Sequence, residues 1–485
     1  MKPAAHLITA RLAACLLLLA GCAGTGVEAG NGQAVKPQNV ILFLGDGMGV
    51  STVTAARILA GQQAGKLGEE HELPFETFPN VSLVKTYNTD SQVADSAGTM
   101  SAIMTGEKTR IGMFGVRASV SRNDCAAALE NELPTLLEEA EDRGHPTGII
   151  STARITHATP AATYGHTPNR GWEVDAVLPT TAVEAGCRDL ARQMVEFEHG
   201  DGIEVILGGG RAAFLPAGAA DPEYGQPVGM RGDARDLAQE WVAAADGRQY
   251  VWNAGQLRAA ASDGQILGLF EPSHMQYEAD RNSSDEGEPS IAEMTRFAIE
   301  RLQAESAESG KGFFLMVEGG RIDHGHHAGN AYRSLTDAVA MADAVQVAMD
   351  LTAEADTLIL VTADHSHTLT ISGYPRRGNP ILGKVESGLA EMTRDAAGRP
   401  YTTLSYANGP GYREEAPDLT NVDTEDKEFL QVASVPMASE THGGEDVAAY
   451  ARGPNADTLR GVIEQNEIYQ VLRGALFPEE QQLFK

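Results

Sequence analysis

The chain has 485 residues, of which 42% are hydrophobic, and this composition excludes an intrinsically disordered protein. The 37 lysine and arginine residues face 67 aspartate and glutamate residues, which gives a formal net charge of −30. Such a chain lacks the basic surface that nucleic acids require, so we expect no nucleic-acid partner. A small anionic ligand is not excluded, because bound metal ions and one arginine invert the field locally.

The N-terminal residues 1–21 have the pattern of a signal peptide. Lys2 and Arg11 precede an apolar run from Leu12 to Ala20 that is too short to span a bilayer. We therefore expect an exported protein whose folded part begins further along the chain.

The signal pattern ends in the letters LAGC, which resemble a bacterial lipobox with Cys22 as the lipidated residue. Residues 22–37 would form a Gly-rich, lipid-anchored tether. Ala23 after the cysteine is typical of outer-membrane sorting, which predicts a lipoprotein facing the periplasm or the cell surface. The alternative is an ordinary signal peptide followed by a chance cysteine.

Two cysteines remain for the folded part of the chain. Cys15 leaves with the signal and Cys22 belongs to the lipobox, so Cys125 and Cys187 remain. An even pair in an oxidising compartment predicts a disulfide, and two free buried thiols are the alternative.

The body of the chain alternates apolar runs with helical patterns. The runs are typical of strands buried on both faces, and they are Asn39 to Leu44, Thr147 to Ile150, Ile203 to Leu207, Phe313 to Val317 and Thr357 to Val361. The helical patterns are Leu133 to Arg143, Thr181 to Glu198, Ile291 to Gln303 and Ala331 to Leu351. This alternation predicts an α/β fold, with a doubly wound, mostly parallel central sheet flanked by helices. Two Gly- and Pro-rich stretches, about 215–289 and 372–435, are interpreted as insertions.

Acidic residues and histidines follow the predicted strands, where open α/β sheets bind ligands. Six of the 13 histidines lie in three such segments, which are 318–327, 363–367 and 440–446, and Asp46 follows the first strand. Carboxylates with imidazoles suit zinc, and an all-oxygen set suits magnesium. One zinc takes only three or four ligands, so the sequence predicts two or more metal ions. Each segment alone would more often be a turn or a surface motif, but their combination argues against a purely structural role.

A candidate nucleophile opens a helical pattern of small residues from Ala97 to Thr105. Ser96 would face the free N–H groups and the positive end of the helix dipole, which suits attack on an anion. The alternative is that Ser96 only caps the helix. No general base is adjacent in sequence, and a zinc ion on the hydroxyl would serve instead by lowering its pKa.

Together these segments resemble the alkaline phosphatase family, and its animal-type branch more than the enterobacterial form. The matching segments run from about residue 38 to 470 and read GDGMG, DSAGTMSAIMTG, HATPAATYGHTPNRGW, VEGGRIDHGHH, VTADHSH and ETHGGEDVAAYARGP. The resemblance implies a catalytic domain over residues 38–473. It also implies hydrolysis of phosphate monoesters to alcohol and inorganic phosphate through a phosphoserine on Ser96, with two zinc ions and one magnesium ion.

The resemblance also assigns the site residues. Arg170 would bind two phosphate oxygens, and His157 and His324 would lie beside the magnesium, at positions where the enterobacterial form has lysine or aspartate. The implied metal ligands are Asp323, His327 and His442 for the first zinc, Asp46, Ser96, Asp364 and His365 for the second, and Asp46, Thr159 and Glu318 for magnesium.

Three further features follow from the resemblance. Cys125 and Cys187 match a disulfide of the animal-type enzymes. A calcium-type site would use Glu223, the Phe270 carbonyl, Glu271 and Glu288, the last standing where the family has aspartate. The stretch 372–435 resembles the crown insertion, which meets its twin in a homodimer.

Three other functions compete with this interpretation. A sulfatase needs a C/S-x-P-x-R context, and the sequence SAGTM starting at Ser96 has neither the proline nor the arginine. A phosphodiesterase would carry a threonine nucleophile and lack the three-metal set. A non-catalytic phosphate- or metal-binding lipoprotein would have no use for a nucleophile.

Overall fold

The computed structural model describes residues 38–389 and 391–481. The expected signal peptide at 1–21 and the tether with Cys22 lie outside the described residues. None of the helices in the described part of the chain is both long enough and apolar enough to cross a membrane.

The fold is built on a ten-stranded sheet with the strand order β15-β2-β14-β8-β1-β7-β3-β4-β6-β5. All its neighbouring strands are parallel except β14, which is antiparallel to both β8 and β2. The strands are β1 (Asn39–Gly45), β2 (Asn80–Lys85), β3 (Thr147–Arg154), β4 (Val205–Gly209), β5 (Gln249–Val251), β6 (Ile266–Leu269), β7 (Phe314–Gly319), β8 (Thr357–Ala363), β14 (Val447–Arg452) and β15 (Gly461–Glu464). The predicted α/β class with a mostly parallel sheet is therefore confirmed.

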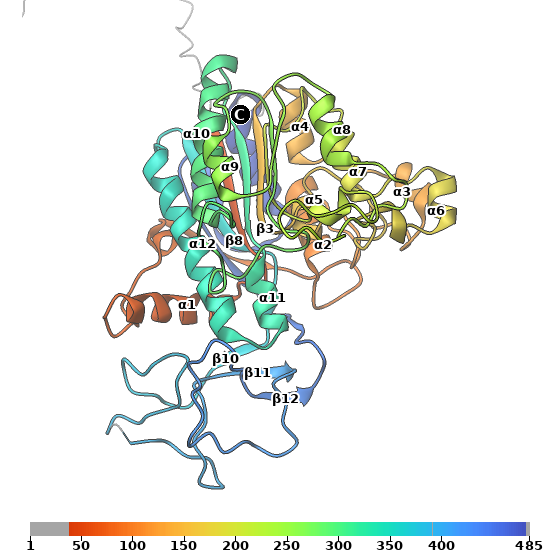
Figure 1. Ribbon diagram of the computed structural model, residues 1–485. Helices are drawn as coiled ribbons and strands as arrows, with labels where there is room; N and C mark the ends of the chain where they lie inside the picture. The colour runs from red at the N-terminus through yellow and green to blue at the C-terminus, as the bar shows by residue number, and fades with distance from the viewer. Residues whose placement is uncertain (1–37, 390, 482–485) are drawn as a thin grey trace, which may run out of the picture. The chain divides into compact units, whose positions relative to one another are not determined.

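Helices cover both faces of this sheet (Figure 1). The long helices α10 and α12 both pack on β7. Helix α12 also packs on β1, and α10 also packs on β3 and β4. Helix α13 packs on β1 and contacts α2 and α4. The helices are α1 (Val50–Gln63), α2 (Ser96–Thr105), α3 (Cys125–Leu129), α4 (Leu136–Asp142), α5 (Ala158–Ala161), α6 (Thr180–Ala185), α7 (Leu190–Val195), α8 (Leu237–Ala243), α9 (Ala254–Ala259), α10 (Ile291–Ser309), α11 (Arg321–His327), α12 (Ala331–Leu351), α13 (Glu467–Leu476) and α14 (Pro478–Gln481).

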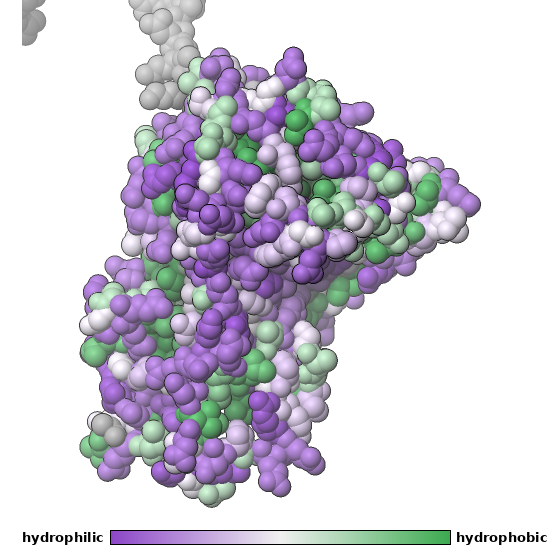
Figure 2. All heavy atoms as spheres, in the orientation of Figure 1, coloured by the Kyte–Doolittle hydropathy of each residue, from purple (hydrophilic) through white to green (hydrophobic). Residues whose placement is uncertain are grey.

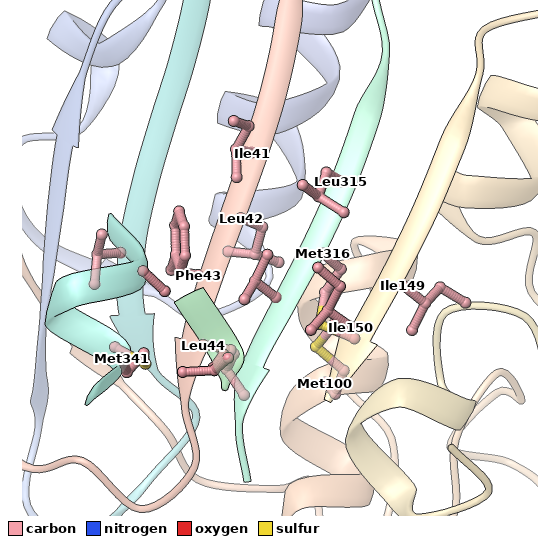
Figure 3. Packing of buried hydrophobic residues seen from close by; sticks show 14 of the residues in the cluster. Ile41, Leu42, Phe43, Leu44, Met100, Ile149, Ile150, Leu315, Met316 and Met341 are labelled. Atoms are coloured by element: carbon pink, nitrogen blue, oxygen red, sulfur yellow. The ribbon is translucent and has the colours of Figure 1, made fainter. Parts of the chain in front are cut away.

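The centre of the core lies at β1 and its neighbours. Ile41, Leu42, Phe43 and Leu44 are fully buried, and Figure 3 shows them beside residues of β7 and β3. Burying each such side chain stabilises the fold by about 1.5–3 kcal/mol. The parallel registers align Gly45 of β1 with the ends of β7 and β8, so the residues that follow these strands meet at one edge of the sheet.

One predicted helix is wrong. The pattern Thr181 to Glu198 forms two helices, α6 and α7, because Gly186 adopts a left-handed φ of 97° and Asp189 caps a new helix. Cys187, in the break between them, forms a disulfide with Cys125 of α3, so the predicted pairing is confirmed.

The interpretation of 215–289 as an insertion needs correction. This stretch contains β5 and β6, which extend the central sheet beyond β4. Their runs are only three and four residues long, which is too short for the apolar pattern to predict them.

The stretch 372–435 lies beyond the carboxyl ends of the central strands, below α11 in Figure 1. It contributes β11 (Leu404–Gly409) and most of β12 (Ala433–Pro436) to a separate three-stranded sheet with β10 (Leu369–Ile371). A two-stranded sheet, β9 (Ser366–His367) with β13 (His442–Gly443), lies close to the central strand ends. Hydrophilic residues predominate on the face shown in Figure 2, as the composition predicts.

Candidate active site

The ends of three adjacent parallel strands place three acids together. Asp46 follows β1, Glu318 lies near the end of β7, and Asp364 follows β8, and all three are fully buried. His365 comes next in the chain, and its Nε2 lies 3.4 Å from Asp46 Oδ1 and 3.3 Å from Asp364 Oδ2. The backbone N–H of Gly47 donates to Asp364 Oδ1 at 3.0 Å, which fixes that carboxylate.

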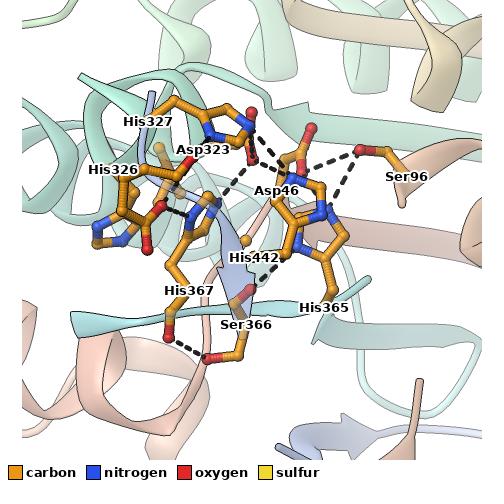
Figure 4. A network of polar contacts seen from close by, with 12 residues as sticks. Asp46, Ser96, Asp323, His326, His327, His365, Ser366, His367 and His442 are labelled. Carbon is orange, nitrogen blue, oxygen red and sulfur yellow. Dashed lines mark hydrogen bonds and ion pairs between the residues drawn. The ribbon is translucent and has the colours of Figure 1, made fainter. Parts of the chain in front are cut away.

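Ser96 is the first residue of α2 and points into this cluster (Figure 4). Its Oγ lies 3.5 Å from Asp46 Oδ1 and 3.3 Å from His365 Nε2. The helix cap is Asp95, whose carboxylate accepts the Gly98 N–H at 3.2 Å. The alternative that Ser96 serves only as the cap is therefore wrong, because Asp95 is the cap and the Ser96 hydroxyl contacts Asp46 and His365 instead.

A second cluster forms around Asp323 of α11. His327 is one helical turn further on, so both side chains share a face of the helix. The Nε2 atoms of His327 and His442 each lie 3.4 Å from Asp323 Oδ1, and they lie 3.2 Å from each other. His442 comes from β13, which pairs His442 with His367 of β9.

The rings of this cluster are oriented by backbone carbonyls. His327 Nδ1 donates to the Glu440 carbonyl at 2.6 Å, and His442 Nδ1 donates to the Ala94 carbonyl at 2.7 Å. Because a carbonyl only accepts, each Nδ1 carries a hydrogen and each ring turns its Nε2 toward Asp323. This is the arrangement of metal-binding histidines. Burial lowers the pKa of His327, which keeps its ring neutral.

A third group consists of oxygens without partners. Within the described residues, Asp46 Oδ2, Thr159 Oγ1 and Glu318 Oε1 are buried and make no hydrogen bond. Burial and the neighbouring Asp364 raise the pKa of Asp46 well above its usual value, and burial raises that of Glu318 to about 7. Buried carboxylates of this kind need a compensating cation. An all-oxygen set fits magnesium, and the imidazole–carboxylate sets fit zinc.

Arg170 lies beside these groups on the loop after α5. Its Nη1 donates to Asp95 Oδ2 at 2.9 Å, and its Nη2 lies 3.2 Å from His157 Nε2. The ring centroids of His157 and His324 lie 5.4 Å apart. The predicted neighbours of the magnesium position are therefore found together.

Three residues of this region were missed from the sequence. His367 Nε2 lies 2.7 Å from Asp323 Oδ1, and its Nδ1 lies 2.5 Å from Glu440 Oε2. His274 packs on His324 with ring centroids 4.1 Å apart. His367 and Glu440 lie inside segments already singled out, which was the available signal, whereas His274 lies in the misinterpreted 215–289 stretch.

The expected calcium-type residues form a separate acidic group. Glu271 accepts from Tyr224 Oη at 2.7 Å and from Gln276 Nε2 at 3.0 Å, and Glu288 accepts from the Gln276 N–H. Burial and the nearby Glu271 raise the pKa of Glu288 to about 9. Glu223 differs, because it is held by the Arg211 guanidinium at 2.9 Å. Phe270, whose carbonyl was the fourth expected ligand, is buried beside them.

Comparison with known proteins decides the family. The alkaline phosphatase family model matches residues 37–477. The chain belongs to the alkaline phosphatase family. It is 48% identical over 442 residues to the tissue-nonspecific isozyme of alkaline phosphatase from Gallus gallus, covering 89% of this chain and 83% of that one. It is 47% identical over 443 residues to the alkaline phosphatase of Gadus morhua, covering 89% and 90%.

Solved structures show the same fold. The alkaline phosphatase of the Antarctic bacterium TAB5 matches with a TM-score of 0.62 and 22% identity over 91% of this chain and 99% of that one. The Thermus thermophilus alkaline phosphatase matches with a TM-score of 0.64 and 24% identity over 91% and 92%. The predicted family, fold and enzyme class are confirmed, so this alkaline phosphatase is a metal-dependent phosphomonoester hydrolase. The sulfatase, diesterase and non-catalytic interpretations are disfavoured.

Proposed function

We propose that this alkaline phosphatase hydrolyses phosphate monoesters through a phosphoserine on Ser96. The supporting observation is the Ser96 hydroxyl, which caps nothing and points at Asp46 and His365. A bond forms from Ser96 Oγ to phosphorus as the ester P–O bond breaks and the alcohol leaves. Water then cleaves the phosphoserine and releases inorganic phosphate.

Two zinc ions and one magnesium ion complete the proposal. Their ligands would be Asp323, His327 and His442 for one zinc, Asp46, Ser96, Asp364 and His365 for the other, and Asp46, Thr159 and Glu318 for magnesium. The metals would supply charge stabilisation at the attacking and leaving oxygens and lower the pKa of the serine hydroxyl and of water. The unpartnered buried oxygens and the carbonyl-oriented imidazoles support this assignment.

Arg170 and α2 act on the phosphoryl group itself. The planar guanidinium would donate to two phosphate oxygens, which lysine could not copy. The N-terminal dipole of α2 favours an anion beside Ser96. Asp95 orients the guanidinium and also caps the helix, so one carboxylate fixes both.

Replacing the nucleophile tests the covalent route. Ser96→Ala should lose nearly all release of alcohol from a chromogenic phosphate monoester while keeping its zinc and magnesium, measured by elemental analysis. Ser101→Ala, in the same helix, is the control and should stay active. Activity of the unaltered protein should vanish with a chelator and return with the two metals. Unchanged turnover in Ser96→Ala would exclude the phosphoserine.

The other assignments remain proposals with their own tests. We propose that the calcium-type residues Glu223, Phe270, Glu271 and Glu288 bind one calcium ion, and Glu271→Gln should then lose one equivalent of bound calcium. Export followed by lipidation at Cys22 predicts that Cys22→Ala moves the protein from the membrane fraction to the soluble fraction.

We also propose a homodimer through the crown stretch 372–435. Tyr374 and Leu389 of this stretch are 98% and 82% exposed, and large exposed apolar side chains are typical of interfaces. Light scattering should give twice the chain mass, and Tyr374→Asp with Leu389→Asp should halve it.

A further inference from the structure

A further acidic cluster, distinct from the active site and from the calcium-type residues, lies at the opposite end of the sheet from the active site. Glu141 lies in the last turn of α4, Asp201 in the loop before β4, and Glu204 directly before that strand. One ligand oxygen of each lies within 4.8 Å of the others. The eight residues of β3 separate the two ends of the sheet, which is about 25 Å at the usual rise per residue. This cluster is therefore no part of the catalytic machinery.

Glu141 has a buried carboxylate oxygen without a partner. The residue is 1% exposed, its Oε1 accepts from the Thr147 hydroxyl, and its Oε2 makes no hydrogen bond to any residue that the structure describes. Glu204 is 7% exposed, and its Oε2 accepts the Thr147 N–H at 2.6 Å. A buried carboxylate oxygen left without a partner is costly, and the described part of the chain gives Glu141 Oε2 none.

No cationic side chain supplies that group. Among residues 38–389 and 391–481, none of the three carboxylates forms an ion pair with a lysine, arginine or histidine. Arg301 interacts with Glu204 only at longer range, and it donates instead to the carbonyls of Ala261 and Gly264.

A glycine brings the Asp201 loop against the unpartnered oxygen. Gly200 has a left-handed φ of 55°, and a Cβ there would lie 2.7 Å from Glu141 Oε2. Only glycine allows this approach. Gln265 Nε2 donates to the carbonyls of Asp201 and Gly202 at 2.7 Å each and holds the loop in place. The oxygens are thus pre-arranged, and the exposed Asp201 leaves a path from solvent.

We propose that Glu141, Asp201 and Glu204 bind a hard divalent cation, calcium or magnesium. The donor set contains only oxygens, including the Thr147 hydroxyl beside the carboxylates, and such sets select hard cations over zinc. The ion would tie the end of α4 to the start of β4 and replace the missing partner of Glu141. Without it, burial and mutual repulsion raise the pKa of Glu141 to about 10 and burial raises that of Glu204 to about 8, so protons would have to take its place.

Counting bound ions tests the site. The full chain is stripped with chelator and dialysed against calcium, and separately against magnesium, and bound ions and affinity are measured. Glu141→Gln should bind one equivalent fewer than the unaltered protein. Asp201→Asn, an exposed change that should not disturb folding, should bind that equivalent about tenfold or more weakly. The phosphomonoester turnover of Asp201→Asn, measured on a separate sample never exposed to chelator, should stay unchanged.

A control separates this site from the other acidic group. Glu271→Gln removes a calcium-type residue beyond the carboxyl end of β4 and should leave the equivalent at Glu141 intact. Cation binding at Glu141 should raise the melting temperature. Adding the cation should therefore still raise the melting temperature of Glu271→Gln, whereas Glu141→Gln should lose the part of the rise that this site contributes. Equal stoichiometry and affinity in the unaltered protein, Glu141→Gln and Asp201→Asn would overturn the proposal and leave a protonated acid pair.

Discussion

Asp95 allows the most direct test of how Arg170 is positioned. One of its carboxylate oxygens caps α2, and the other accepts from the Arg170 guanidinium. Oδ1 accepts from the Gly98 N–H, from Asn88 Nδ2 and from the Gly112 N–H at 3.0–3.2 Å. Oδ2 accepts from Arg170 Nη1 at 2.9 Å and again from Gly112. Asp95→Asn keeps Oδ1 as the helix cap but replaces the acceptor that holds the guanidinium by an NH2 group.

The size of the effect follows from the environment of that bond. A hydrogen bond between charged partners contributes about 1.5–3 kcal/mol. The Arg170 and Asp95 side chains are 24% and 11% exposed, so the lower part of that range applies. If Arg170 loses about 1.5 kcal/mol of stabilisation, phosphate should bind roughly tenfold more weakly.

The assay is competitive inhibition of monoester hydrolysis by inorganic phosphate. Asp95→Asn should raise the inhibition constant about tenfold with little change in thermal stability, since asparagine caps helices as well as aspartate does. Asp124→Asn is the matched control, because Asp124 caps α3 in the same way and, in the described part of the chain, forms no hydrogen bond or ion pair with Arg170. An inhibition constant within twofold of the unaltered value would refute the role of Asp95.

Three further predictions follow from the geometry. Arg170→Ala should weaken phosphate inhibition more than Asp95→Asn does, and an unchanged inhibition constant would remove Arg170 from the phosphate site. Reducing the Cys125–Cys187 disulfide, which spans a sequence separation of 62, should lower the free energy of unfolding of that segment by about 4 kcal/mol, measured by denaturant titration with and without reductant. The Glu138 carboxylate counteracts burial and raises the pKa of His166 to about 9, so its contribution of up to about 3 kcal/mol should be complete below pH 6.5 and lost as the pH rises through 9. The stability difference between the unaltered protein and His166→Gln should therefore shrink from pH 6 to pH 10, and a constant difference would contradict the ion pair.

Much of the fold could be predicted because its strands are buried on both faces. The run Asn39 to Leu44 is apolar for that reason, and it becomes β1 at the centre of the sheet. The polar residues directly after such strands had to meet at one edge, since parallel strands end together. Asp46 and Asp364 were found this way, from strand ends alone.

Other parts of the site depend on pairings that local sequence does not encode. His367 reaches Asp323 because β9 pairs with β13, two short strands far apart in the chain. His274 reaches His324 only because the stretch after β6 returns to the end of the sheet. The break between α6 and α7 depends on Gly186, whose left-handed conformation interrupts an otherwise continuous helical pattern.

The same reasoning explains why the sequence alone does not reveal the cluster of Glu141, Asp201 and Glu204. The active-site acids follow strands, so each stands out against an apolar run. Glu141 instead ends a helix whose other faces carry further acids, and Glu204 precedes β4 in a loop that is itself acidic. Only burial separates them from solvated surface acids. Searching for polar residues directly after apolar strands therefore identifies sites at the carboxyl edge of a parallel sheet. It misses sites at the amino edge, where the side chains come from helices and loops.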